Sequence, residues 1–167
     1  MNINFIKNKY DKTIAKIQIK TNKVSFDIEL RGFITVLGGI SSSGKTFFVE
    51  TLYNQYLNNS QDLKSKFGLQ GIQILNTLTL NEAIEDKEMI GILKSRKGFL
   101  IVIDNADTIL ENRAALIEHI SRDTSNQYII MSRGGVNLGI SPNHYSELEN
   151  KDGKIVNKFL TTIPGWK

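Results

Sequence analysis

The chain has 167 residues, the length of one compact domain, and it has no cysteine and two histidines, which excludes disulfide frameworks, thiolate zinc sites and histidine-rich metal sites. Its composition, 40% hydrophobic and 23% charged, is that of a globular protein, and the net charge of +4 is compatible with a nucleic-acid partner as well as with ordinary solubility. Because there is neither a long apolar span nor an apolar signal core, we expect a cytoplasmic protein without a membrane partner.

The first half of the chain predicts a hairpin, a strand and a helix, in that order. Apolar and polar residues alternate over 16–20 and 24–30 with a turn between them, which predicts an opening hairpin at about 14–31. The apolar run 33–37 stops at two glycines and predicts a buried strand that feeds a tight loop. Apolar residues then recur at helical spacing over 45–58, and the stretch 58–70 is the most loop-like of the chain.

The second half alternates strands and helices. We expect strands at 72–75, 99–103 and 128–131, and helices at 80–94 and 106–122. This order is typical of an α/β domain with a parallel sheet built from right-handed crossovers. Two further strands, at 144–149 and 155–160, flank an Asp-Gly turn and predict a closing hairpin at about 144–162. The core would then occupy about 32–143 of a single domain.

The strongest motif lies between the strand at 33–37 and the helix that follows it. The run Gly39-Ile40-Ser41-Ser42-Ser43-Gly44-Lys45-Thr46 matches the phosphate-loop pattern G-x-x-x-x-G-K-[ST] in full, and we include Phe47 among the predicted nucleotide-binding residues. Glycines let backbone amides point at a polyphosphate, to which the helix adds its positive end. Lys45 would contact the β- and γ-phosphates and Thr46 would ligate Mg²⁺. A simple glycine-rich turn would explain neither residue.

A carboxylate for the metal follows the apolar strand at 99–103. Asp104 stands where this strand would emerge beside the phosphate loop, so we expect it to hold Mg²⁺ together with Thr46. The alternative is that Asp104 caps the helix that begins at 106, which is a common role for aspartate after a strand.

Residues 39–46 together with 99–107 resemble the P-loop NTPases, in the branch with an additional strand between the two motifs, which includes AAA+ proteins, signal-transduction ATPases, RecA-like and ABC-type ATPases. The resemblance implies a three-layer α/β fold with a mostly parallel five-stranded sheet ordered 5-1-4-3-2. The two hairpins would be peripheral to it. ATP and Mg²⁺ are the implied cofactors, and Lys45, Asp104 and Arg133 are the implied catalytic residues.

Two positions bear on the subfamily. AAA+ and many related ATPases place a glutamate, the general base, directly after the metal-binding aspartate, but here Asn105 stands there, and an amide cannot take a proton. Asp107 would either substitute as the base or interact with the helix dipole. The segment 131–134 is similar to the sensor segment of signal-transduction ATPases, which implies that Arg133 reads the terminal phosphate. The alternative is a surface arginine in a turn.

These features predict a small Mg-ATP-binding ATPase with weak hydrolysis that acts as a switch or motor subunit in a larger complex. A protein partner or a neighbour in a homo-oligomer would complete its site. Two other classes stay open: a nucleoside or small-molecule kinase, and a non-catalytic interaction module associated with DNA. The base preference is open, with ATP as the default. His119 lies among apolar residues of a predicted helix and is more typical of packing than of a ligand.

Overall fold

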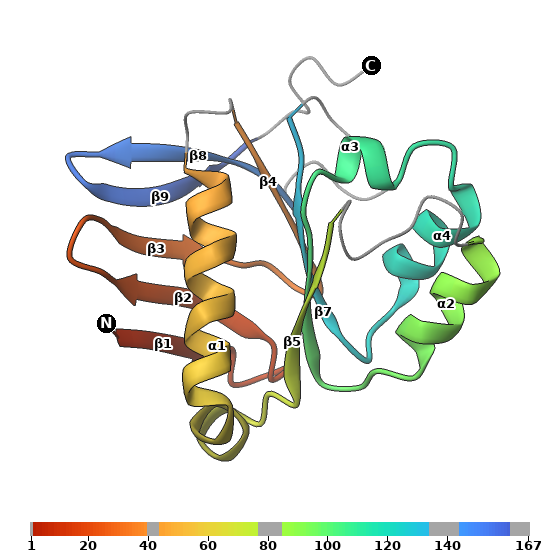
Figure 1. Ribbon diagram of the computed structural model, residues 1–167, viewed down its shortest axis with the longest axis horizontal. Helices are drawn as coiled ribbons and strands as arrows, with labels where there is room; N and C mark the ends of the chain where they lie inside the picture. Colours follow the sequence, from red (N-terminus) through yellow and green to blue (C-terminus); the bar gives the residue numbers. More distant parts are fainter. Residues whose placement is uncertain (1, 40–43, 77–84, 134–143, 161–167) are drawn as a thin grey trace.

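Nine strands and four helices make up the part of the chain that the structure, a computed structural model, describes: residues 2–39, 44–76, 85–133 and 144–160 (Figure 1). The strands are β1 (Asn2–Lys7), β2 (Ile14–Lys20), β3 (Ser25–Glu29), β4 (Ile34–Gly38), β5 (Gly71–Leu75), β6 (Phe99–Ile103), β7 (Gln127–Met131), β8 (Tyr145–Lys151) and β9 (Lys154–Phe159). The helices are α1 (Lys45–Phe67), α2 (Asp86–Lys94), α3 (Ala106–Ile109) and α4 (Ala114–Arg122).

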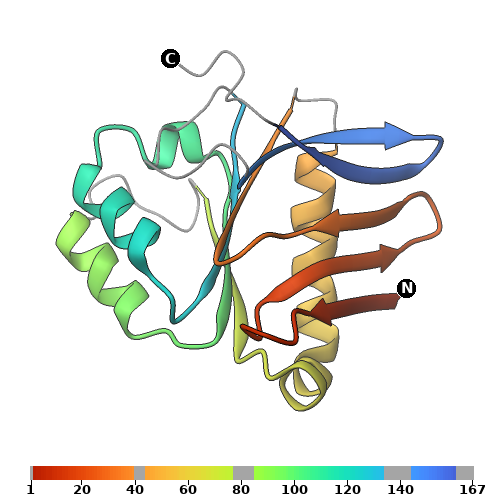
Figure 2. The same ribbon diagram turned by 180° about the vertical axis from the view of Figure 1, so that it is seen from behind.

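All nine strands belong to one mixed sheet, in the order β1-β2-β3-β9-β8-β4-β7-β6-β5. From β8 to β5, neighbouring strands run parallel to one another. The hairpins β1–β2–β3 and β8–β9 are antiparallel within themselves, and they meet where β3 pairs in parallel with β9, through Ser25 and Lys154, Phe26 and Ile155, and Asp27 and Val156. The sheet curls around α1 as a half-barrel, which Figure 2 shows from behind.

The predicted fold class is therefore wrong. Instead of a five-stranded, mostly parallel sheet with peripheral hairpins in a three-layer α/β fold, the chain forms a nine-stranded mixed half-barrel. The hairpins are not peripheral, because β8 pairs with β4 and β9 pairs with β3, so that both hairpins continue the central sheet. Paired strand edges satisfy backbone groups that separate hairpins would leave open. The sequence also did not predict β1, which extends the sheet by one strand.

Two apolar clusters lie on opposite faces of the sheet. One lies between α1 and the concave face, and includes Ile17, Phe26, Phe48 and Leu52. The other packs β4 to β7 against α2, α3 and α4. Strands β4, β6 and β7 are thus covered on both faces, which explains why their sequences are continuous apolar runs rather than alternating ones.

Several predicted elements are confirmed, and others have different limits. Both hairpins are present, and the second turns at Asp152 and Gly153, whose φ angles are 53° and 85°. The helix expected over 45–58 continues to residue 67, with one non-helical residue at Asn59, so only 68–70 of the stretch 58–70 lie outside regular secondary structure. The helix expected over 106–122 is interrupted, since Asn112 has a φ of 59° between α3 and α4.

Of the helix expected over 80–94, the described residues show α2 from residue 86 onwards, while 77–84 lie outside them, as does the glycine turn expected after β7. Among the helices of the described ranges, none combines the length and the apolar character that a bilayer crossing requires.

Candidate functional site

The carboxyl ends of β4, β5, β6 and β7 lie at one edge of the sheet, because these strands are parallel. A cavity of about 570 Å³ opens there. The residues that line it come from the end of β7, from the chain that follows β5, β6 and β7, and from the first turn of α1. They are Lys45, Thr46, Asn76, Asp104, Asn105, Asp107, Thr108, Met131, Ser132 and Arg133. The structure thus brings Lys45, Thr46, Asp104 and Arg133, predicted from separate parts of the sequence, to one cavity.

The phosphate loop joins β4 to α1 at this cavity. Gly39 and Gly44 have φ angles of 132° and 98°, values that favour glycine. A Cβ atom at Gly44 would also lie 2.9 Å from Cδ1 of Ile155, so the backbone passes close to strand β9 at this point. The predicted ligands Ile40, Ser41, Ser42 and Ser43 lie outside the described residues.

Lys45 is the first residue of α1, and 8% of it is exposed. Its Nζ donates a hydrogen bond to the carbonyl oxygen of Gly39. Burial, and secondarily the positive charge of Arg133, lowers the pKa of Lys45, while Asp107 and Asp104 act in the opposite direction. An anion that lies between a buried ammonium and a second cation stabilises the charged form of both.

Asp104 and Thr46, the two predicted metal ligands, line the same cavity. The backbone N–H of Asp104 donates to the carbonyl of Leu75 at 2.8 Å, which fixes the chain where β6 ends, and Oδ1 of Asp104 accepts from the backbone N–H of Asn105 at 2.9 Å. Mg²⁺ is usually held by one or two carboxylates together with substrate phosphates. One carboxylate and one hydroxyl fit this pattern, although the described residues contain no group of three acidic or histidine ligands.

Asn105 adopts a left-handed conformation, with φ 55° and ψ 46°, and it precedes the short helix α3. Asparagine adopts this region more readily than most residues, whereas glutamate pays a steric cost. The position at which AAA+ and many other ATPases carry a glutamate thus has a backbone conformation that suits asparagine.

Asp107 makes contacts that the sequence analysis did not foresee. Its Oδ1 accepts a hydrogen bond from the Ser132 hydroxyl at 2.5 Å, and its Oδ2 accepts from the backbone N–H of Arg133 at 2.7 Å. Asp107 therefore joins the start of α3 to the segment that follows β7. The hypothesis that it interacts chiefly with the helix dipole does not account for these two contacts.

Three further residues concern the lining of the cavity. Asn76 and Thr108 line the cavity without having been predicted. Asn76 directly follows the predicted strand 72–75, and that position at the shared edge was the available signal. The predicted ligand Phe47 is not among the lining residues, and its ring lies 5.8 Å from that of Phe26 on β3.

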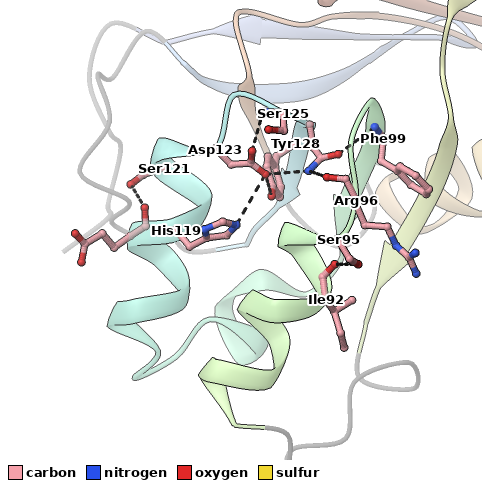
Figure 3. A network of polar contacts seen from close by, with 11 residues as sticks. Ile92, Ser95, Arg96, Phe99, His119, Ser121, Asp123, Ser125 and Tyr128 are labelled. Atoms are coloured by element: carbon pink, nitrogen blue, oxygen red, sulfur yellow. Dashed lines mark hydrogen bonds and ion pairs between the residues drawn. The ribbon is translucent and has the colours of Figure 1, made fainter.

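A second polar network lies at the opposite, amino end of β7 (Figure 3). The Asp123 side chain, 7% exposed, accepts hydrogen bonds from the Tyr128 hydroxyl at 2.5 Å, the Asn126 side-chain amide at 3.0 Å and the Ser125 backbone N–H at 2.8 Å. His119 Nε2 lies 4.0 Å from Asp123 and outside the cavity, in keeping with the packing role expected for this histidine. This network joins α4 to β7 and contributes no residue to the cavity.

Comparison with known proteins adds no relative to this geometry. No protein-family model matches the chain, and no curated protein is significantly similar to it. The functional argument therefore depends on the residues of the cavity.

Proposed function

We propose that the protein binds a nucleoside triphosphate, by default ATP, with Mg²⁺ at this cavity, as a P-loop NTPase does. The observation that carries the proposal is that Lys45 and Thr46, the last two residues of the phosphate-loop motif, line one cavity together with Asp104, which follows the parallel strand β6. In that arrangement Lys45 binds phosphate oxygens, while Thr46 and Asp104 hold the metal. Arg133 supplies a further cation for the terminal phosphate.

The charges of the cavity support a phosphorylated ligand. Lys45 is buried and its pKa is lowered in part by Arg133, so the free site holds two cations that repel each other. A triphosphate would place negative charge between them. The Asp104 carboxylate would favour a divalent cation bound to that triphosphate. Magnesium supplies the charge neutralisation that phosphoryl transfer requires.

Hydrolysis by the isolated chain is proposed to be slow. Asn105 offers no basic group, and the two oxygens of Asp107 already accept hydrogen bonds from Ser132 and Arg133. A protein with tight binding and slow turnover suits a nucleotide-dependent switch or motor subunit, acting in the cytoplasm, whose partner or neighbouring copy completes the site.

The experiment is a joint measurement of nucleotide affinity and turnover. Purified protein is titrated with ATP, ADP and GTP, with and without Mg²⁺ and with and without DNA, beside the Lys45→Ala variant. We expect Mg²⁺-dependent binding that Lys45→Ala weakens at least about a hundredfold, since a charged contact to phosphate is lost. No binding by the wild-type chain to any of the three nucleotides would overturn the proposal.

A second candidate, a kinase of a small acceptor, is favoured by one observation. A groove of about 490 Å³ runs between α1 and the edge strand β5, and it shares Asn76 with the first cavity. Tyr53, Tyr56 and Phe99 line it, and their rings offer surfaces on which a planar acceptor could stack. Transfer of the γ-phosphate to nucleosides at a higher rate than to water would establish this activity. If no acceptor in the screen is phosphorylated, the nucleotide-dependent switch stays the proposed function.

A further inference from the structure

The contacts of Asp107 distinguish it from the other carboxylate of the cavity. Asp104 is placed at the end of β6 by its backbone, whereas the Asp107 carboxylate reaches across to the chain that leaves β7. It binds one side-chain donor, from Ser132, and one backbone donor, from Arg133. Two contacts to successive residues hold a segment in position and in orientation, as a single contact cannot.

The segment held in this way carries Arg133. The Ser132 backbone N–H also donates to the carbonyl of Leu37 at 3.0 Å, so residue 132 is attached both to the strand that feeds the phosphate loop and to Asp107. Ser132 is 1% exposed, while Arg133 is exposed and lines the cavity. The attachment therefore ends at a residue that lines the cavity.

We infer that Asp107 is a positioning residue that sets Arg133 against the terminal phosphate and thereby gives the site its preference for a triphosphate over a diphosphate. This inference rests on the proposed function. In the absence of the Asp107 contacts, the backbone at residue 133 loses its acceptor, and the arginine pays conformational entropy to reach the phosphate. A diphosphate has no terminal group for Arg133 to contact, so its affinity is nearly unaffected.

The test compares the ratio of ATP to ADP affinity in four variants. In Asp107→Asn an amide NH₂ replaces one acceptor oxygen, and we expect the ratio to fall about tenfold, the effect of one charge-assisted hydrogen bond. Ser132→Ala removes one of the two contacts and lowers the ratio less. Asp123→Asn makes the same chemical change at the other end of β7 and leaves the ratio unchanged. Thermal unfolding of each variant confirms that it is folded.

The fourth variant, Arg133→Ala, separates positioning from other roles. If Asp107 acts through Arg133, then Asp107→Asn has no further effect on the ratio when Arg133 is already alanine. Equal losses of ATP and ADP affinity, or a persistent effect in the Arg133→Ala background, would overturn the inference. Loss of turnover with an unchanged ratio would also overturn it and would assign Asp107 as the general base.

Failure of this inference can be told from failure of the proposed function. If the wild-type protein binds no nucleotide, both the proposed function and this inference are wrong. A wild-type protein that binds ATP and ADP equally well, or that keeps its preference in Asp107→Asn and Ser132→Ala, removes the inference and leaves the nucleotide site intact.

Discussion

The two ends of β7 carry similar chemistry in different surroundings. At each end an aspartate from the preceding helical region accepts two or more hydrogen bonds from residues that flank the strand, Asp107 at the carboxyl end and Asp123 at the amino end. The Asp123 side chain is nearly buried, whereas Asp107 lines an open cavity. The same type of contact thus joins buried elements of the fold at one end and, in the function that we propose, arranges ligand-binding groups at the other.

The largest expected effect is on stability at the amino end. Asp123→Ala would leave the Tyr128 hydroxyl, the Asn126 amide and the Ser125 N–H without their acceptor, and we expect the free energy of unfolding to fall by about 3 kcal/mol. Chemical denaturation measures this, with ATP affinity of the folded fraction as the control. A comparable loss in Asp107→Ala would contradict the division of roles between the two ends.

The next largest effect concerns turnover at the carboxyl end. Asn105→Glu places a proton acceptor directly after Asp104, and we expect ATP turnover to rise about a hundredfold, in the range that a general base contributes. The left-handed backbone at this position opposes glutamate by about 1 kcal/mol, which thermal unfolding will show. Asn105→Gln introduces a side chain as long as that of glutamate, at the same cost in stability, but without the base. An equal rise in ATP turnover in that variant would refute the explanation.

A smaller effect is expected for the metal. Asp104→Asn keeps the shape of the side chain and removes its charge, so the gain in ATP affinity on adding Mg²⁺ should fall about tenfold while affinity without Mg²⁺ stays the same or rises. Titrations with and without Mg²⁺ measure this difference. An undiminished Mg²⁺ effect would remove Asp104 from the metal site.

The smallest effect is a pH dependence. Because burial lowers the pKa of Lys45 below 10.5 in the folded chain, the unfolded chain holds a proton that the folded chain releases between the two values. The free energy of unfolding of the ligand-free protein should therefore rise with pH over that window. Thermal unfolding of the wild-type protein and of Lys45→Met across this pH range checks the sign of the change in stability. The same dependence of stability on pH in Lys45→Met would assign the change to other groups.

How much of the site could be predicted depends on how far apart in the sequence its interacting residues lie. Asp104 directly follows a predicted strand, and a short loop joins another predicted strand to Lys45 and Thr46, so the meeting of parallel strand ends was enough to expect them at one edge. Asp107 was expected either to act as the base or to interact with the helix dipole, because nothing in the sequence indicates that its carboxylate reaches the segment that follows another strand. Phe47 was included by its position in the motif, while its ring packs on β3.

For the fold, local patterns predicted both hairpins and missed how they join. The pairing of 25–27 with 154–156 connects residues more than a hundred positions apart, and alternation within each hairpin carries no information on it. Strand β1 has no turn signal comparable to the Asp-Gly of the second hairpin. The continuation of α1 to residue 67 was missed because its second half is mostly polar, although Leu63 is buried against the curled sheet.

The curled sheet has a mechanical consequence for α1. This helix lies in the concavity of the half-barrel, with Phe48 and Leu52 fully buried, and its first residue follows a glycine that lies against Ile155. A piston-like shift of α1 would disturb the largest core of the protein, whereas α2 to α4 cover only one flank of the sheet. Nucleotide-driven motion should therefore pass through the α2–α4 layer, and hydrogen exchange with and without ATP should change there while the centre of α1 stays protected.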